Sequence, residues 1–238
     1  MLDLGKNLSD AFQYAQKLFS DLGRLLILVI LSIIPILNFI MVGYAAKVAR
    51  ESPDGNTPPP LTGYASLFIE GLKVVVVGII YMIIPLILIG PSIIGFISIP
   101  MIPGAPRLFV GGVALITFFA GLILAILASI VFYMGIMNMI KKNSFSKAFA
   151  FGEILETIGN VGWGMYILWI IALVVILAIV GLISAIPIVG WLISLIISPV
   201  VSVLIFRSAA LVYSAGRSLS SSEGSAAVPP PPAPPAAQ

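Results

Sequence analysis

Hydrophobic residues gather in five long runs, which cover residues 25–44, 74–99, 108–140, 163–185 and 189–213. A helix needs roughly 20 apolar residues to cross a hydrocarbon core about 30 Å thick. Four of the runs exceed that length, and the first only just reaches it. The pattern predicts an all-α, polytopic transmembrane helical bundle, formed as a single domain by residues 1–217.

Three shorter segments carry apolar residues at helical spacing with charged residues between them. They cover residues 4–22, 61–73 and 144–160, and the first leads straight into the first apolar run. Such periodicity predicts amphipathic helices. We expect them to lie in the membrane interface or to pack on the bundle, in preference to forming solvated loops.

Two stretches have the composition of loop or tail. Residues 53–60 are rich in proline and turn-forming residues, which predicts a water-exposed loop. Residues 218–238 are rich in serine and then in alanine and proline. They bury too little apolar surface to offset the entropy of ordering, so we expect a disordered C-terminal tail.

The tripeptide Ile-Pro-Ile occurs twice, at residues 34–36 and 186–188. Each copy follows an amphipathic segment and an apolar leg, and precedes a second apolar leg with a basic end, which indicates a weak internal parallel repeat. A bend is expected at each proline because proline lacks the backbone N–H. The leg before Pro187 is long enough to span a bilayer, whereas the leg before Pro35 reaches only part-way.

The distribution of the 12 lysines and arginines favours a partial hairpin in the first apolar run. If residues 25–44 crossed the membrane, the basic residues would divide four to eight between the two sides. If the run dips in and returns, eleven share one side and only Arg107 faces the other. The positive-inside rule then predicts four full spans plus a re-entrant or short first hairpin, with both termini cytoplasmic in a multi-pass cell-membrane protein. A full crossing, with the N-terminus outside, is the alternative.

Composition narrows the chemistry that the chain supports. It has no cysteine and no histidine, which excludes thiolate and imidazole chemistry and the zinc sites built from them. No carboxylate lies within the five apolar runs, which argues against a proton- or ion-coupled pump. Basic residues form no run longer than Lys141–Lys142, so we expect no nucleic-acid partner. We expect no enzymatic activity, no catalytic residue, no cofactor and no metal.

Three positions are candidates for structural or ligand contacts. Pro35 would have to be buried in the bundle, because non-helical backbone at bilayer depth must be covered by protein or water. Asn38 is expected to cap backbone groups freed at that bend, or to contact a ligand. Arg207 is the one charge well inside an apolar run, and snorkelling to the headgroups is its expected behaviour. Pairing of Arg207 with Glu70 or with a glutamate at 153–156 is the alternative.

Several short sequence blocks follow one another in a fixed order. They are Ile34-Pro35-Ile36-Leu37-Asn38-Phe39-Ile40, Gly43-Tyr44, Val48-Ala49-Arg50, Pro58-Pro59-Pro60-Leu61, Leu67-Phe68-Ile69-Glu70-Gly71-Leu72-Lys73, Tyr81 and Pro85. Together they resemble an archaeal and bacterial family of membrane proteins, the domain of unknown function 4013, over residues 8–215. The chain departs from that pattern at residues 62–64, where members often carry an acidic-aromatic step. The resemblance implies a helical polytopic fold and brings no activity or catalytic residue.

Two kinds of function remain open from the sequence. The first is a non-catalytic scaffold, complex subunit or bilayer-shaping protein, whose partner is the lipid bilayer, with protein partners or a homo-oligomer left open. The alternative is a small permease for an uncharged or lipidic solute. It would need a polar cavity lined by Asn38, Ser92, Ser98, Thr117 and Ser129. A dry, tightly packed bundle would count against the permease.

Overall fold

The computed structural model describes residues 3–98 and 107–226, and the regular structure in them is entirely helical. The elements are α1 (Leu4–Gln16), η1 (Lys17–Ser20), α2 (Leu22–Ile33), α3 (Asn38–Glu51), α4 (Tyr64–Ser98), α5 (Arg107–Lys142), η2 (Phe145–Phe149), α6 (Phe151–Val161), α7 (Trp163–Ser184) and α8 (Val189–Ala226), where η denotes a 3₁₀-helix. The predicted all-α class is confirmed.

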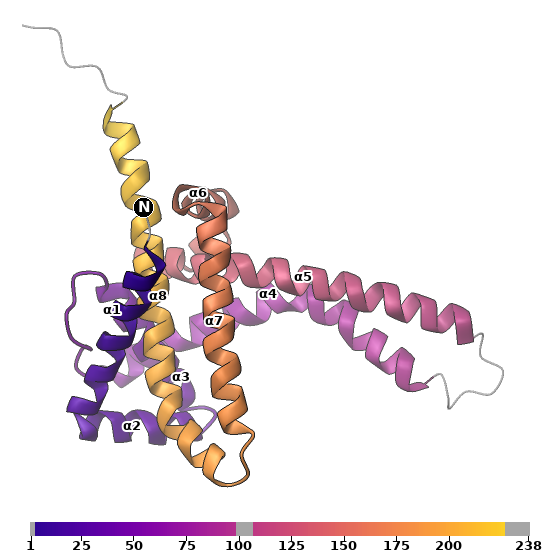
Figure 1. The fold of residues 1–238 in the computed structure, drawn as a ribbon, viewed down its shortest axis with the longest axis horizontal. Coiled ribbons are helices and arrows are strands. Elements are labelled where there is room, and N and C mark those ends of the chain that lie inside the picture. The colour runs from indigo at the N-terminus through magenta and orange to yellow at the C-terminus, as the bar shows by residue number, and fades with distance from the viewer. Residues whose placement is uncertain (1–2, 99–106, 227–238) are drawn as a thin grey trace, which may run out of the picture.

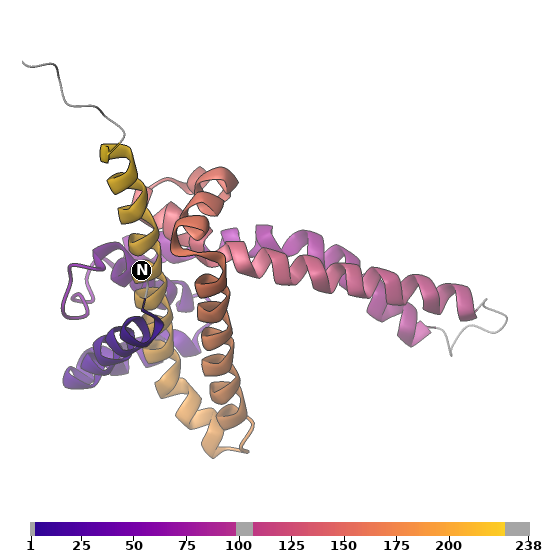
Figure 2. The same ribbon diagram turned by 45° about the horizontal axis from the view of Figure 1, so that its top comes forward.

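Four helices in the described part of the chain are long and apolar enough to cross a membrane. These segments are Tyr64–Ile97, Phe109–Lys142, Trp163–Ser184 and Val189–Ser218. α4 packs along α5, and α7 packs along α8, which gives two hairpins that we call the α4–α5 arm and the α7–α8 arm. The arms leave a shared end of the molecule in different directions (Figures 1 and 2). We call this shared end, where α1, α3, η2 and α6 also lie, the base.

The first apolar run is broken into two helices, as the Ile-Pro-Ile pattern predicts. Residues 34–37 form a turn between α2 and α3, and α2 has only 12 residues. The two flanks of the run meet at the base, because the Tyr14 hydroxyl donates a hydrogen bond to the Thr57 carbonyl at 3.0 Å. The fold therefore contains four candidate spans plus a short first apolar hairpin. The second Ile-Pro-Ile lies at the turn between α7 and α8.

The bounds of the three amphipathic segments differ from the predicted ones. In the first segment, the α-helix ends at Gln16. The next α-helix begins after Asp21, whose carboxylate caps it by accepting a hydrogen bond from the Arg24 backbone N–H at 3.0 Å. The second is not a separate helix but the first turns of α4, because no proline interrupts the chain between Tyr64 and Pro85. The third divides at Ala150 into η2 and α6.

The last helix reaches into the segment that the sequence predicts as a C-terminal tail, because α8 continues to Ala226. No helix-breaking proline occurs in this part, and a helix that is already nucleated extends at little cost. The alanine- and proline-rich remainder of the predicted tail lies outside the described residues.

The tightest packing lies where α3 crosses α4. A Cβ atom added at Gly43 would sit 1.8 Å from the Leu67 carbonyl oxygen, and one added at Gly71 would sit 1.8 Å from the Phe39 carbonyl oxygen. The two helix backbones are therefore in direct contact through a pair of glycines. Small residues allow such close approach between membrane helices, where van der Waals packing supplies much of the attraction.

Candidate functional site

Arg207 is the centre of a charged cluster at the base. Its side chain is only 4% exposed, and its Nε donates to Asp10 Oδ1 at 2.9 Å. Its Nη1 donates to Ser52 Oγ at 3.1 Å and to the Gly55 carbonyl at 3.0 Å. The guanidinium also lies over the Tyr14 ring, 4.6 Å from the centroid. The expected snorkelling is thus wrong, and the pairing partner is Asp10 rather than Glu70 or a glutamate at 153–156.

The proline-rich loop after α3 is held by five cationic side chains from five different elements. We call this arrangement the carbonyl clamp, because each cation donates to main-chain carbonyls of residues 50–60. The donors, with their acceptors, are Lys17 (Asn56, 2.7 Å), Arg24 (Pro58, 2.6 Å, and Pro59, 3.0 Å), Lys47 (Pro60, 3.0 Å), Lys141 (Arg50, 3.0 Å, and Ser52) and Arg207 (Gly55).

Most of residues 53–60 are exposed, as the sequence predicts, but the clamp holds part of the loop against the protein. Ser52, Pro58 and Pro59 are buried, and the Tyr44 hydroxyl also donates to the Pro59 carbonyl, at 2.9 Å. The physical reason lies in the prolines, which have a carbonyl acceptor but no N–H donor. A buried proline-rich segment therefore has surplus acceptors, and side-chain cations satisfy them.

A second polar network ties η2 and α6 to the rest of the base. Glu153 accepts from Lys142 at 2.6 Å, from Lys147 at 2.7 Å and from the Asn138 amide at 2.9 Å. The Tyr213 hydroxyl donates to the Asn138 side-chain oxygen at 2.8 Å, which connects the network to α8. The hydrogen bonds from Lys142, Lys147 and Asn138 lower the pKa of Glu153 to about 2. Glu153 is therefore a permanently ionised structural anchor at neutral pH.

A third network, which sequence reasoning missed, joins α1, α7 and α8. The Trp169 indole N–H donates to Ser208 Oγ at 2.8 Å, and Ser208 Oγ donates to the Asn7 side-chain oxygen at 2.5 Å. All three side chains are buried. In the sequence, the only sign of this network is that Asn7 and Ser208 are polar residues at apolar helix positions. Nothing in the sequence identifies their hydrogen-bond partners.

The other two candidate positions lie at the α2–α3 turn, away from these networks. Pro35 is exposed, contrary to the expectation that the bundle buries it, and its neighbours Ile34 and Ile36 are exposed as well. Asn38 donates from its amide to the Ser32 carbonyl at 3.2 Å. That carbonyl lies in the last turn of α2, where helix carbonyls have no partner within the helix.

The polar residues suggested for a permease cavity hydrogen-bond within the protein. Ser92 and Thr117 bond each other at 2.6 Å across the α4–α5 arm, beside a mainly apolar hollow of about 310 Å³. Ser129 donates to the Ala125 carbonyl one turn earlier in α5. The Ser98 side chain lies outside the described part of the structure. Four of the five predicted lining residues therefore form hydrogen bonds within the protein. They are Asn38, Ser92, Thr117 and Ser129.

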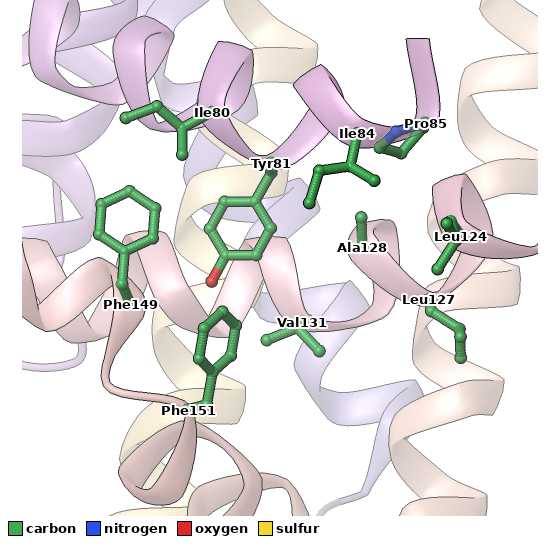
Figure 3. Close-up of a pocket in the computed structure, with 10 residues that line it drawn as sticks. All are labelled: Ile80, Tyr81, Ile84, Pro85, Leu124, Leu127, Ala128, Val131, Phe149 and Phe151. Carbon is green, nitrogen blue, oxygen red and sulfur yellow. The ribbon is translucent and has the colours of Figure 1, made fainter. Parts of the chain in front are cut away.

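An apolar groove of about 450 Å³ lies between the α4–α5 arm and the start of α6 (Figure 3). We call it the Tyr81 groove. It is lined by Ile80, Tyr81, Ile84, Pro85, Leu124, Leu127, Ala128, Val131, Phe149 and Phe151. The Tyr81 hydroxyl donates to the Ala148 carbonyl at 2.7 Å, and its ring stacks on Phe149 with centroids 5.6 Å apart. The remaining lining is hydrocarbon, so the groove is built for an apolar ligand.

None of these clusters has the composition of a metal site. Within residues 3–98 and 107–226, no three aspartates or glutamates come together in a way that would hold a metal ion. The absence of cofactors and catalytic residues stays a prediction from the sequence.

A comparison with protein-family sequence models gives a match over residues 27–189, to the family described as a protein of unknown function, DUF4013. The chain belongs to this family. The DUF4013 match begins inside α2 and ends at the first residue of α8, so it is narrower than the resemblance over 8–215. It includes the Gly43–Gly71 crossing and the Tyr81 groove, whereas Asp10 and Arg207 lie outside it. Neither the curated proteins nor the solved structures give a match.

Proposed function

We propose that this DUF4013 protein is a non-catalytic membrane protein that shapes the bilayer by inserting more helix into one leaflet than into the other. The observation that carries the proposal is the length and composition of α2. Its 12 residues are apolar except for Gly23, Arg24 and Ser32. At 1.5 Å per residue it is about 18 Å long, against a hydrocarbon core of about 30 Å. It is suited to enter one leaflet and too short to cross both.

Both faces of α2 support this placement. Leu25, Leu28 and Leu31 are buried on the inner face, which packs on α8. On the outer face, Leu26 is 60% exposed and Ile30 is 49% exposed. A helix that is apolar all round is stable where its outer face meets lipid or protein rather than water.

The distribution of helices between the two ends of the arms adds to the asymmetry. α1, α2 and α3 all pack on α8, α3 also packs along α4, and Phe12 and Phe19 add exposed apolar surface to this group. At the far end of the α4–α5 arm, Figure 1 shows no helix besides α4 and α5 among the described residues. More protein in the leaflet at the base would expand that leaflet, so we expect the membrane to curve with the base on its convex side.

The charges of the base support a cytoplasmic orientation. The carbonyl clamp and the Glu153 network together contain seven of the 12 lysines and arginines, whereas Arg107 begins α5 at the far end of its arm. The positive-inside rule favours such an end on the cytoplasmic side. Both termini would then be cytoplasmic, and the bilayer would be convex towards the cytoplasm.

Membrane tubes pulled from giant vesicles test the proposal. A Ser9→Cys variant, labelled from outside with a membrane-impermeant dye, reports only molecules whose base faces outwards. We expect these molecules to be enriched on the tube relative to the parent vesicle, because the tube is convex outwards. Equal density on tube and vesicle would refute bilayer shaping.

A pair of double variants assigns the effect to α2. Ile30→Ser with Ile33→Ser makes the outer face of α2 polar, and we expect it to abolish enrichment. Val174→Ser with Val175→Ser removes comparable apolar surface from α7, where both residues are about half exposed, and should retain enrichment. Loss of enrichment in both double variants alike would contradict the role of α2.

A further inference from the structure

A cationic cluster includes Lys147 of η2, the element whose Phe149 lines one end of the Tyr81 groove. Lys142 and Lys147 flank Glu153, so the three side chains sum to a charge of +1. All three are partly exposed, at 27% for Lys142, 39% for Lys147 and 30% for Glu153. Their outer surfaces therefore remain open to a further anion.

The chain connects this cluster to the groove over three consecutive residues. Lys147 provides a cation, the carbonyl of Ala148 accepts from the Tyr81 hydroxyl, and Phe149 stacks on the Tyr81 ring. Figure 3 shows Tyr81 reaching from α4 towards Phe149 and Phe151, which close this end of the groove. An apolar chain in the groove would thus have its polar end near Lys147.

We propose that the Tyr81 groove and the Lys142–Lys147 cluster bind one anionic phospholipid from the surrounding bilayer. An acyl chain lies between α4 and α5, and the phosphate lies against the two lysines. The bilayer is the source because the groove is formed mainly by two candidate spans, and its rim residues Ile84 and Leu127 are 61% and 53% exposed. A volume of about 450 Å³ falls within the range of about 300–1,000 Å³ that is usual for small-ligand sites.

The net charge of the cluster predicts the headgroup preference. One uncompensated cation near a membrane surface favours an anionic lipid by about 1 kcal/mol, which converts to about fivefold in affinity. This inference goes beyond the proposed function, since it concerns retention of a lipid and not the curvature of the membrane. Either can fail without the other.

Native mass spectrometry of the full chain in mild detergent provides the test. The probes are phosphatidylglycerol and phosphatidylcholine with the same two oleoyl chains. We expect one phosphatidylglycerol per chain, held about fivefold more tightly than phosphatidylcholine. Lys147→Gln brings the cluster to zero charge and should remove the preference while retaining phosphatidylcholine binding.

Groove-filling variants locate the acyl chain. Ala128→Phe occupies the groove floor, and Leu127→Trp narrows its rim, so that one variant remains if the other does not fold. Both should weaken retention of both lipids, whereas Ile126→Phe, on the opposite side of α5, should bind as the unaltered protein does. Equal retention of the two lipids by the unaltered protein would overturn the proposal. So would undiminished retention of phosphatidylglycerol in either folded groove variant.

Discussion

Replacing Gly43 by alanine is expected to destabilise the fold by about 3 kcal/mol or more, through overpacking against a backbone that has no room to move. The new methyl group would lie 1.8 Å from the Leu67 carbonyl oxygen, so α3 and α4 must separate. For a chain of this size, such a loss lowers the melting temperature by about 6–12 °C. Thermal unfolding in detergent, followed by circular dichroism, measures the effect, and Gly71→Ala should behave in the same way.

Gly112→Ala in α5 and Gly159→Ala in α6 are the matched controls. A Cβ atom at either position meets nothing within 4 Å. Since alanine is favoured over glycine in a helix by roughly 0.5–1 kcal/mol, we expect these variants to be neutral or slightly more stable. A melting temperature of Gly43→Ala equal to that of the controls would show that α3 and α4 are not in backbone contact.

Replacing Arg207 by methionine is expected to have the second large effect, a destabilisation of about 2–3 kcal/mol. The change removes a buried charge that bonds Asp10, Ser52 and the Gly55 carbonyl, and leaves their acceptors without this donor. We expect a smaller loss of folding free energy than for a fully buried ion pair, because the Asp10 side chain is 47% exposed. Backbone amides at residues 54–57 should also exchange hydrogen faster, since the loop loses one of its five cationic donors.

The control for Arg207→Met is Lys6→Met, which removes a cation from the same region of the protein. The Lys6 Nζ atom lies 3.8 Å from Asp3 Oδ2, and the side chains of Lys6 and Asp3 are 88% and 54% exposed. Exposed pairs of this kind contribute about 0–1 kcal/mol. Equal melting temperatures for the two variants, with unchanged exchange in the loop, would show that the carbonyl clamp does not stabilise the base.

The features that the sequence predicted well are local ones. The four long apolar helices and the turns at Pro35 and Pro187 follow from residues that are close together in the chain. The Glu70–Lys73 pair, expected from its i, i+3 spacing, is present at 3.1 Å. Such features depend on helix geometry and proline chemistry, which hold whatever the tertiary structure.

The features that the sequence could not predict depend on contacts between distant segments. Arg207 and Asp10 are 197 residues apart, and their pairing requires that α1 pack along α8. The predicted helix end at Lys73 was also wrong. The residues change from charged to apolar there, but α4 continues through this position. The Arg50–Glu70 ion pair at 2.7 Å likewise follows only from the crossing of α3 over α4.

We infer that the hairpin formed by the first apolar run places α1 and the clamped loop on the same side of the membrane. The chain has no cysteine, so single cysteines can be introduced at Ser9, Thr57 and Ile186 without interference. Labelling with a membrane-impermeant maleimide, in sealed vesicles of one orientation, should modify Ser9→Cys and Thr57→Cys from one side and Ile186→Cys from the other. Modification of Ser9→Cys and Thr57→Cys from opposite sides would contradict this placement.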